Sequence, residues 1–538
     1  MSSYPSAITI ARSGPLKGLN PVMAFWSKFI VLALILFGAL WADIASWLFT
    51  AIKDWMVTSL KWYYLASVAG FLFFALWLMF SRYGDVRLGD DDERPQFSYF
   101  SWFAMLFSAG MGIGLVFWSI AEPIYHFQSN PFMPDSLART PEAAGIAMRL
   151  TFFHWGLHPW GVFAVTGLAL AYFSYRWGLP LTVRSALYPL IGERIYGPLG
   201  HVADVLAVLA TVFGVATSLG LGVQQMATGL YELTGSTLFV DQVVKDGVVT
   251  STPNLTAMLV LIAVISAIAT LSVVSGVGRG VKLLSELNIW LSIIILAFLL
   301  AFGPTRYLLN LLLQVTGDYL AEVIPLGLWS DANQDRPWQG SWTAFYWGWW
   351  ISWAPFVGMF IARISRGRTV REFILGVLLV PTLVTFVWLV AFGGTALHIE
   401  LFGNGGIAEV VASDLTRALY VTFAKMDLGW LGGAASLVAT LLIATYFITS
   451  ADSATLVVTT LLAAGDAEPP TVHRALWGMG EGVVAAVLLL VGGLGALQTA
   501  SITSALPFSV VMLLMCVGLV KALRQEPLRY RPASVGTA

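Results

Sequence analysis

The sequence is poor in charge and in cysteine. Only 11% of its 538 residues are charged, against about 25% in soluble domains, so the chain does not cover a water-facing surface of its size. The single cysteine, Cys516, excludes a disulfide framework and a cysteine-based metal site. The balance of 29 basic and 30 acidic residues lacks the excess positive charge of a nucleic-acid-binding protein. HExxH, GxSxG and Walker A motifs are absent, so we expect no enzyme.

Hydrophobic residues make up 58% of the chain, and its mean hydropathy is +0.78. Apolar runs recur with about the 20 residues that cross a hydrocarbon core of about 30 Å. We therefore predict an all-α polytopic membrane protein with about twelve transmembrane helices. Their expected cores are 25–43, 60–80, 99–124, 144–174, 203–232, 255–275, 284–313, 340–362, 372–397, 430–464, 472–495 and 500–522.

Twelve spans place both termini on one side of the membrane. With the termini and alternate loops on one face, that face has 20 of the 29 lysines and arginines, Arg279, Arg529 and Arg531 among them. The positive-inside rule then predicts cytoplasmic tails at 1–24 and 523–538. Between the seventh and eighth predicted spans, 314–339 is expected to be an amphipathic helix on the outer surface, with an ordered surface loop as the alternative.

Glycines interrupt the third span at Gly110, Gly112 and Gly114. Glycine weakens a helix, and opened backbone inside a membrane is tolerated only where it faces protein, water or a ligand. Such a break offers amides to a carboxylate and carbonyls to a cation. The alternative is a small-residue face for close helix packing, because Gly110 and Gly114 are four residues apart. A dinucleotide-binding loop is excluded because no strand precedes these glycines.

Tryptophans cluster in the eighth span, at Trp347, Trp349, Trp350 and Trp353. Tryptophan in membrane proteins usually lies at the interface with water, but these residues lie near the centre of the predicted span. Grouped indole faces attract a quaternary ammonium, which has no N–H to donate. Pro355 removes one backbone hydrogen bond beside the cluster and loosens the helix.

A second aromatic group contains Trp155 and Trp160, which fall on different faces of a regular helix, so we expect only one of them to line a cavity. His154 and His158 are spaced like a metal pair, but no acid or third ligand accompanies them in the sequence. We interpret both as hydrogen-bonded structural residues.

Hydroxyl side chains interrupt the tenth span at Thr449, Ser450 and Ser453, next to Asp452. Polar groups inside a membrane are costly unless they are satisfied. Thr449 and Ser450 supply oxygen ligands of the kind that Na⁺ accepts. Hydrogen bonding of the hydroxyls back to helix carbonyls explains them equally well without an ion.

Together these motifs resemble the betaine–carnitine–choline transporter family, over about residues 20–523. The resemblance is carried by Ala109–Gly114 with Glu122-Pro123, by Trp349–Phe360, and by the basic loop Arg363–Thr369. It implies a LeuT-like fold of two inverted five-helix repeats, helices 3–7 (99–313) and 8–12 (340–522), preceded by two helices with an acidic loop (25–98). It also implies alternating access, a homotrimer and a multi-pass location in the bacterial inner membrane.

The resemblance also assigns residues. The substrate site would comprise Ala109, Gly110, Met111, Gly112, Gly114, Trp155, Trp160, Phe163, Trp349, Trp350, Trp353, Phe356 and Phe360. Phe163 stands where some relatives have tyrosine. Na⁺, the expected coupling ion, would bind at Ser108, Met111, Tyr446, Thr449 and Ser450, and a second Na⁺ near Thr217 and Ser218. No organic cofactor is expected.

Gly114 bears on the choice of substrate. Proton-coupled choline members of the family have a similar motif with aspartate at this position, so glycine favours a zwitterion such as glycine betaine carried with Na⁺. The alternatives are proton-coupled choline or betaine uptake, sodium-independent exchange, and uptake of dimethylsulfoniopropionate or ectoine. An intramembrane enzyme acting on lipid or quaternary amines is the rival from another class.

Overall fold

The computed structural model describes residues 8–245, 248–275 and 282–526, so Arg279, Arg529 and Arg531 lie outside the described residues. Helices form nearly all of it, with one antiparallel hairpin of β1 (Val240–Lys245) and β2 (Val248–Pro253). The first half contains α1 (Pro21–Leu40), α2 (Ala42–Phe80), α3 (Tyr99–Gly110), α4 (Ile113–Gln128), α5 (Pro141–Trp155), α6 (Leu157–Ala171), α7 (Tyr188–Ile191), α8 (Pro198–Thr234), α9 (Leu255–Ser275) and α10 (Lys282–Phe302). The second contains α11 (Thr305–Leu328), α12 (Phe345–Ile364), α13 (Val370–Leu389), α14 (Thr395–Phe402), α15 (Ile407–Ser413), α16 (Ala418–Lys425), α17 (Trp430–Leu462) and α18 (Thr471–Leu523).

Many of these helices are membrane spans by length and composition. Within the described residues, 10 are long and apolar enough to cross a bilayer, or up to 11 if the bent pair α3–α4 is one span. The predicted spans 472–495 and 500–522 are joined in α18, which is kinked at Gly492 and Gly493. The polytopic membrane architecture is confirmed, whereas the count of twelve stays a prediction.

The amphipathic helix differs from its predicted bounds. α10 ends at Phe302 and α11 starts at Thr305, before the boundary expected at 314. Pro304 separates them because proline disfavours a helical conformation in the residue before it. Buried Leu311 and Tyr319 alternate along α11 with exposed Leu313 and Leu320. This segment is therefore helical and amphipathic, and the alternative of a surface loop is wrong for 314–328.

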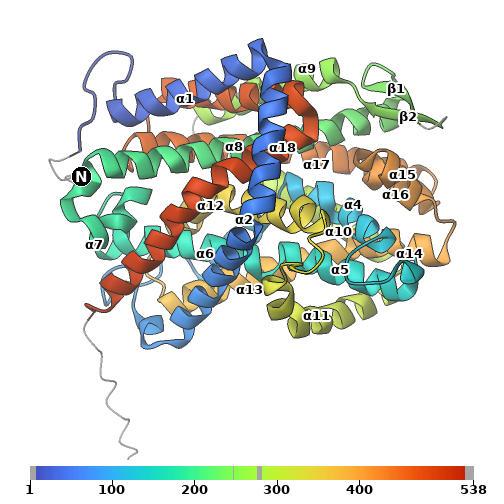
Figure 1. Ribbon diagram of the computed structural model, residues 1–538, viewed down its shortest axis with the longest axis horizontal. Helices are drawn as coiled ribbons and strands as arrows, with labels where there is room; N and C mark the ends of the chain where they lie inside the picture. The colour runs from blue at the N-terminus through green and yellow to red at the C-terminus, as the bar shows by residue number, and fades with distance from the viewer. Residues whose placement is uncertain (1–7, 246–247, 276–281, 527–538) are drawn as a thin grey trace, which may run out of the picture.

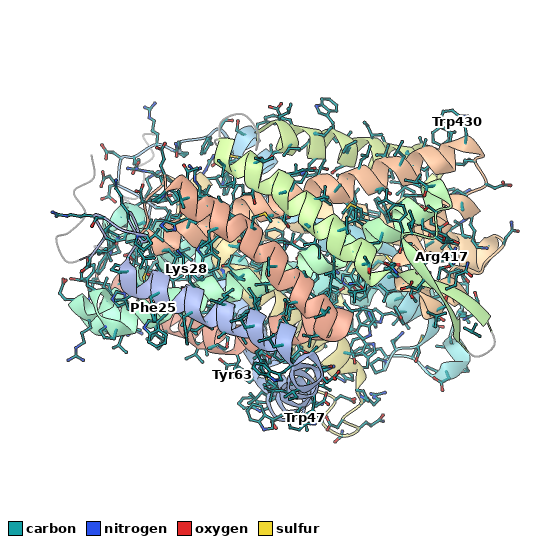
Figure 2. All side chains as sticks on the ribbon, turned by 90° about the horizontal axis from the view of Figure 1, so that it is seen from above. Phe25, Lys28, Trp47, Tyr63, Arg417 and Trp430 are labelled. Carbon is teal, nitrogen blue, oxygen red and sulfur yellow. The ribbon has the colours of Figure 1, made fainter. Side chains whose placement is uncertain are left out.

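The outer helices present apolar side chains outward. Trp47 and Trp430 are 69% and 79% exposed, and both lie at the rim of the molecule in Figure 2. In a soluble protein such a surface would be a liability, but in a bilayer it faces lipid.

The centre of the molecule consists of α4, α5, α6, α8 and α12. An apolar 18-residue stretch of the Pro141–Arg176 span is 94% buried, whereas the corresponding stretch of α1 is only 28% buried. α12 packs against α6, α8 and α18, which brings its tryptophans beside the α3–α4 break. The start of α1 and the end of α18 lie at the same end of the molecule as α7, and the hairpin lies at the other end (Figure 1).

Candidate functional site: an aromatic pocket beside a broken helix

The break predicted in the third span is present. α3 ends at Gly110, α4 begins at Ile113, and their axes are bent by 61°. Between them Met111 (φ −99°, ψ 125°) and Gly112 (φ −167°, ψ 178°) are extended. The end of α3 and the start of α4 therefore carry backbone groups without helical partners, which is the arrangement that binds charged ligands in membrane transporters.

The neighbouring glycines serve close packing as well. A side-chain carbon built on Gly114 would lie 2.3 Å from Trp349, and one on Gly110 would lie 3.3 Å from Trp160. The same atom on Gly112 would meet nothing nearer than Trp353, at 3.9 Å. Gly112 thus lies in the extended break, while Gly110 and Gly114 admit the pocket's aromatic rings.

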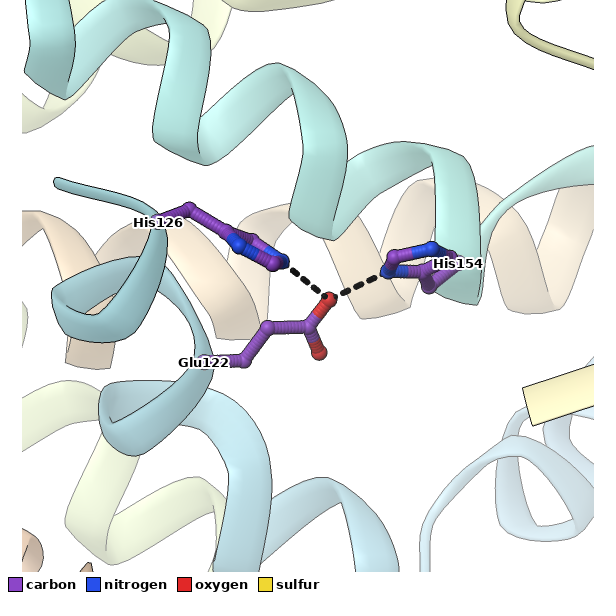
Figure 3. Close-up of side chains that lie close together, drawn as sticks. All are labelled: Glu122, His126 and His154. Carbon is purple, nitrogen blue, oxygen red and sulfur yellow. Dashed lines mark hydrogen bonds and ion pairs between the residues drawn. The ribbon is translucent and has the colours of Figure 1, made fainter. Parts of the chain in front are cut away.

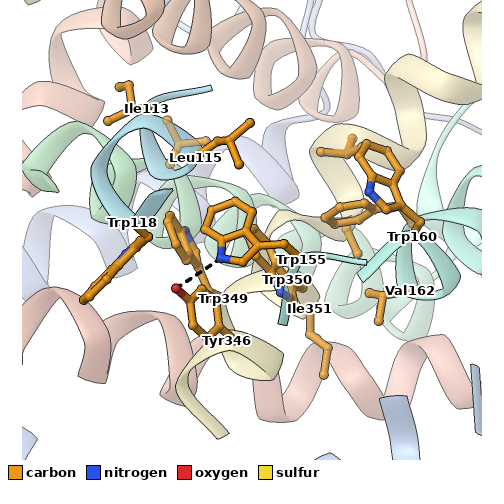
Figure 4. Packing of buried hydrophobic residues seen from close by; sticks show 14 of the residues in the cluster. Ile113, Leu115, Trp118, Trp155, Trp160, Val162, Tyr346, Trp349, Trp350 and Ile351 are labelled. Atoms are coloured by element: carbon orange, nitrogen blue, oxygen red, sulfur yellow. Dashed lines mark hydrogen bonds between the residues drawn. The ribbon is translucent and has the colours of Figure 1, made fainter. Parts of the chain in front are cut away.

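Six aromatic side chains from α5, α6 and α12 line the pocket; Figure 4 shows Trp155, Trp160, Trp349 and Trp350 among them. The rings of Trp349 and Trp350 stack with centroids 4.9 Å apart, and Trp155 meets Trp350 edge-on, also at 4.9 Å. Phe163 joins this group to Trp160, with ring centroids 5.3 Å apart. Such edge and stacked contacts hold large rings in fixed orientations.

These residues and the broken helix line one cavity. Its lining is Ala109, Gly110, Met111, Gly112, Gly114, Leu115, Trp155, Pro159, Trp160, Phe163, Trp349, Trp350, Trp353 and Thr385. None of these side chains is charged. The structure brings together all the predicted substrate residues except Phe356 and Phe360, and adds Leu115, Pro159 and Thr385, which the sequence analysis missed.

Trp155 and Trp160 both line the cavity, so the expectation that only one would do so is wrong. The expectation assumed one regular helix, but α5 ends at Trp155 and α6 starts at Leu157. Gly156 between them has φ −92° and ψ −130°, outside the helical region. Counting helical faces across this residue therefore gave the wrong direction for one of the two side chains.

The indole N–H groups are engaged outside the cavity. Trp350 donates to the carbonyl of His154 at 2.9 Å. Trp349 and Trp353 both donate to the carbonyl of Gly214 on α8, at 3.3 and 2.9 Å. Because these polar edges are satisfied by backbone, the faces of the rings are left for a ligand that is attracted to π-electrons.

Glu122 on α4 lies between His126 and His154 (Figure 3) and also bonds to Trp155. One carboxylate oxygen accepts from Trp155 Nε1 at 2.9 Å and from the Tyr346 hydroxyl, and the other lies 2.6 Å from His154 Nδ1. His126 lies 3.4 Å from the same carboxylate. The statement that no acid accompanies His154 is therefore wrong, because the partner comes from a different helix. His158 instead stacks on Trp347, with ring centroids 5.4 Å apart. Its Nδ1 is buried without a hydrogen-bond partner among the described residues, so the interpretation of His158 as hydrogen-bonded is wrong.

Glu122, His126 and His154 each offer one atom that could bind a metal ion, and these three atoms all lie within 4.8 Å of one another. His154 is bonded on both ring nitrogens, since Nε2 lies 3.1 Å from the Thr343 hydroxyl. These contacts give His154 the hydrogen-bonded role expected from the sequence. The group fixes the orientation of Trp155 in the cavity wall.

A second pocket, lined by oxygens, lies on the other side of Trp353, whose side chain lines both cavities. Its lining includes the five residues of the predicted first Na⁺ site, which are Ser108, Met111, Tyr446, Thr449 and Ser450, and also Ser453, Phe356 and Phe360. Ser285 and Asn288 are polar lining residues that the sequence analysis missed. Its volume is about 770 Å³. Asn288 donates to the Thr449 hydroxyl at 2.9 Å, and that hydroxyl donates to the carbonyl of Thr445 at 3.1 Å.

Thr217 and Ser218, predicted for a second Na⁺ site, lie elsewhere. They are buried on α8 and line neither pocket. The Thr217 hydroxyl donates to the carbonyl of Leu497 at 2.9 Å and lies 2.8 Å from the Ser501 hydroxyl on α18. Ser218 makes a weak contact with the carbonyl of Gly214 at 3.4 Å.

Comparison with known proteins identifies the family. The model of the betaine/carnitine/choline transporter family matches residues 22–528. The chain is 46% identical over 513 residues to a probable glycine betaine transporter of Desulfitobacterium hafniense, covering 95% of this chain and 98% of that one. A glycine betaine transporter of Acinetobacter baylyi is 45% identical over 95% of this chain and 74% of its own. An osmo-dependent choline transporter of the same organism is 42% identical over 99% of this chain and 76% of its own.

These matches span nearly the whole chain, including the broken helix and the tryptophan-rich helix that line the aromatic pocket. The proteins matched are transporters, which agrees with the expectation that the chain is not an enzyme. The chain belongs to the betaine/carnitine/choline family of multi-pass membrane transporters.

Proposed function

We propose that the protein imports glycine betaine, or a closely similar zwitterion, by Na⁺ symport. The observation that carries the proposal is the adjacency of two pockets with different chemistry. The aromatic pocket offers ring faces to a quaternary ammonium and backbone amides at the break to a carboxylate. The oxygen-lined pocket beside it offers hydroxyl and amide oxygens to a hard cation.

The absence of charged side chains from the lining of the aromatic pocket favours a zwitterion over choline. A choline cation in this pocket would leave its charge without a counter-charge, which is costly in a membrane interior. Glycine betaine brings its own carboxylate. The names of the relatives, which include both glycine betaine and choline transporters, are compatible with either substrate.

The coupling follows from the shared helix break. Ser108 and Met111 line the oxygen-lined pocket, while Ala109, Gly110 and Met111 line the aromatic pocket. An ion bound on one side of the break would therefore hold the backbone that meets substrate on the other side. Alternating access would follow from movement of two inverted repeats, 99–313 and 340–522, around this point.

The proposal includes the location of the protein in the bacterial inner membrane, a homotrimeric assembly, and cytoplasmic termini. Arg176, in a loop assigned to the cytoplasmic side, forms an ion pair of 2.6 Å with Glu526 after α18. This contact supports placing the end of α18 on the same side as that loop.

Uptake of labelled glycine betaine into proteoliposomes tests the proposal under an inward Na⁺ gradient, a proton gradient, and no gradient. We expect accumulation only with Na⁺, and chemically unchanged label inside. Accumulation with a proton gradient, or exchange without a gradient, would contradict Na⁺ coupling. Chemical conversion of the label would point to the intramembrane enzyme instead. Choline is the matched competitor, and we expect it to inhibit weakly.

A further inference from the structure

Two buried carboxylates lie outside both pockets. Asp452 on α17 and Glu481 on α18 are 1% and 0% exposed, and neither lines the aromatic or the oxygen-lined pocket. Thr455, three residues after Asp452 on α17, contacts Glu481. No ion pair joins either of them to a basic side chain in the described ranges. Uncompensated acids inside a membrane are costly and usually mark an ion or proton pathway.

Hydroxyl groups surround these acids without satisfying them. Ser272 on α9 donates to one oxygen of Asp452 at 2.6 Å, and the Thr455 hydroxyl lies 3.5 Å from one oxygen of Glu481. The other oxygen of each acid, Asp452 Oδ1 and Glu481 Oε1, is buried without a hydrogen-bond partner, as is Thr270 Oγ1. Ser266 Oγ, on the same helix as Thr270, is unpaired as well. Buried polar atoms are nearly always paired, so this group of unpaired oxygens around two acids indicates a missing ligand.

The fold brings these oxygens together through glycine. A side-chain carbon on Gly478 of α18 would lie 2.9 Å from Thr270 Oγ1 and 3.5 Å from Thr455 Oγ1. The hydroxyls of α9 and α17 therefore meet across the missing side chain, one turn before Glu481. Gly482 lets Ser266 approach in the same way one turn further on. Small residues four apart permit this close approach of membrane helices.

We propose that Asp452, Glu481, Thr270 and Thr455 bind one Na⁺ between α9, α17 and α18. Carboxylate and hydroxyl oxygens select hard cations over transition metals, which prefer nitrogen and sulfur ligands. Ca²⁺ takes about six to eight oxygens. One oxygen of each acid already accepts from Ser272 or Thr455, and the oxygens left for an ion are fewer than Ca²⁺ requires. With one Na⁺ bound, a proton on one carboxyl makes the group neutral. This ion is additional to the coupling ion of the oxygen-lined pocket, and the proposal does not depend on that ion.

The bound ion would join α9 to the two helices that flank it. α17 also carries Tyr446, Thr449 and Ser450 of the oxygen-lined pocket. An ion at Asp452, one residue from Ser453 in the lining of that pocket, would fix the position of α17 and thereby the geometry of the pocket. The expected role is therefore to hold α17 in place.

Counting bound ions tests the proposal without transport. The purified full-length protein is equilibrated with radioactive Na⁺ in the absence of substrate, with ionic strength held constant by N-methyl-D-glucamine. We expect the double variant Asp452→Asn/Glu481→Gln to bind one Na⁺ fewer per chain than wild type and to lose part of the Na⁺-dependent rise in Tm. Thr459→Val removes a buried hydroxyl one turn after Thr455 that already donates to the carbonyl of Thr455 at 2.6 Å. This variant is the matched control and should keep the wild-type count.

Two further arms make every outcome decisive. If the double variant does not fold, as judged by size-exclusion chromatography and circular dichroism, Thr270→Val/Thr455→Val replaces it. This second variant should weaken Na⁺ binding about tenfold, a loss of about 1.4 kcal/mol. An unchanged ion count or affinity in the folded variant overturns the proposal, and means that the acids hold protons instead. Saturation of the site by Ca²⁺ but not by Na⁺ also overturns it. Thr449→Val, which should affect only the coupling site, separates failure of this proposal from failure of Na⁺ symport.

Discussion

The two pockets on either side of Trp353 differ in how their polar groups are used. In the aromatic pocket the indole N–H groups of Trp349, Trp350 and Trp353 all donate to backbone carbonyls, so the faces of the rings line the cavity. In the oxygen-lined pocket the hydroxyl of Thr449 and the amide of Asn288 are themselves part of the wall. One wall therefore binds through polarisable surfaces, and the other through oxygen ligands.

This difference predicts that substitutions on the two sides will change different quantities. Changes to the aromatic pocket should alter apparent affinity for glycine betaine and leave the Na⁺ dependence of uptake unchanged. Changes to the oxygen-lined pocket should do the reverse. The broken helix, which both pockets share, should affect both quantities.

The largest effect is expected at Gly114. Gly114→Ala places a carbon 2.3 Å from Trp349, so the ring must leave its stacked position against Trp350. We expect uptake to fall by at least about a hundredfold, because off-rotamer shifts in a packed core cost about 1–3 kcal/mol and the displaced ring also loses contact with substrate. Uptake measured in proteoliposomes tests this.

Gly112→Ala is the control for Gly114→Ala, since its backbone is extended and the nearest atom is 3.9 Å away. It should retain more than about half of wild-type uptake, because surrounding atoms need not move. Equal loss in both variants would mean that glycine is needed for movement of the break and not for packing of Trp349. The same clash indicates that Gly114→Asp would disturb Trp349 before it could alter preference for choline.

The next effect is expected at Trp350. Trp350→Leu removes the ring that stacks on Trp349 and meets Trp155. A desolvated cation–π contact is worth about 2 kcal/mol, so we expect apparent affinity for glycine betaine to fall about thirtyfold, with an unchanged Na⁺ half-saturation. Trp347→Phe changes a buried tryptophan outside the pocket lining and should leave the affinity as it is. A normal affinity in Trp350→Leu would exclude this residue from the cage.

Sequence could predict the parts of this site that depend on local residue order. The break at Met111 and Gly112 follows from glycine spacing, and the hydroxyls of Thr449 and Ser450 are adjacent on one helix. It could not predict the partners that come from other helices. Glu122 meets Trp155, and Asn288 meets Thr449, through packing of helices far apart in the chain. The directions of Trp155 and Trp160 were also predicted wrongly, because they were assigned on one regular helix and Gly156 interrupts the helix between them.

A smaller effect is expected at Thr449. Thr449→Val removes a hydroxyl from the oxygen-lined pocket without changing the volume of the side chain. We expect the Na⁺ half-saturation of uptake to rise about tenfold, the loss of one ligand worth about 1–1.5 kcal/mol, with little change in affinity for glycine betaine at saturating Na⁺. Thr445→Val, whose hydroxyl bonds only to carbonyls of its own helix and lines neither pocket, is the control. An equal effect in both variants would support the alternative that these hydroxyls only stabilise α17.

The smallest effect is expected at Glu122, because it acts on substrate only through Trp155. Glu122→Gln keeps an oxygen that accepts from the indole N–H and loses the charge that the other partners, His154 and Tyr346, share. A weakened hydrogen bond of about 0.5–1 kcal/mol corresponds to an affinity for glycine betaine about two to five times lower. Glu122→Ala, which leaves the indole N–H unpaired, should be clearly worse than Glu122→Gln. Equal affinities in these two variants would mean that the carboxylate does not position Trp155, and the fixed orientation of the aromatic wall would then depend on ring packing alone.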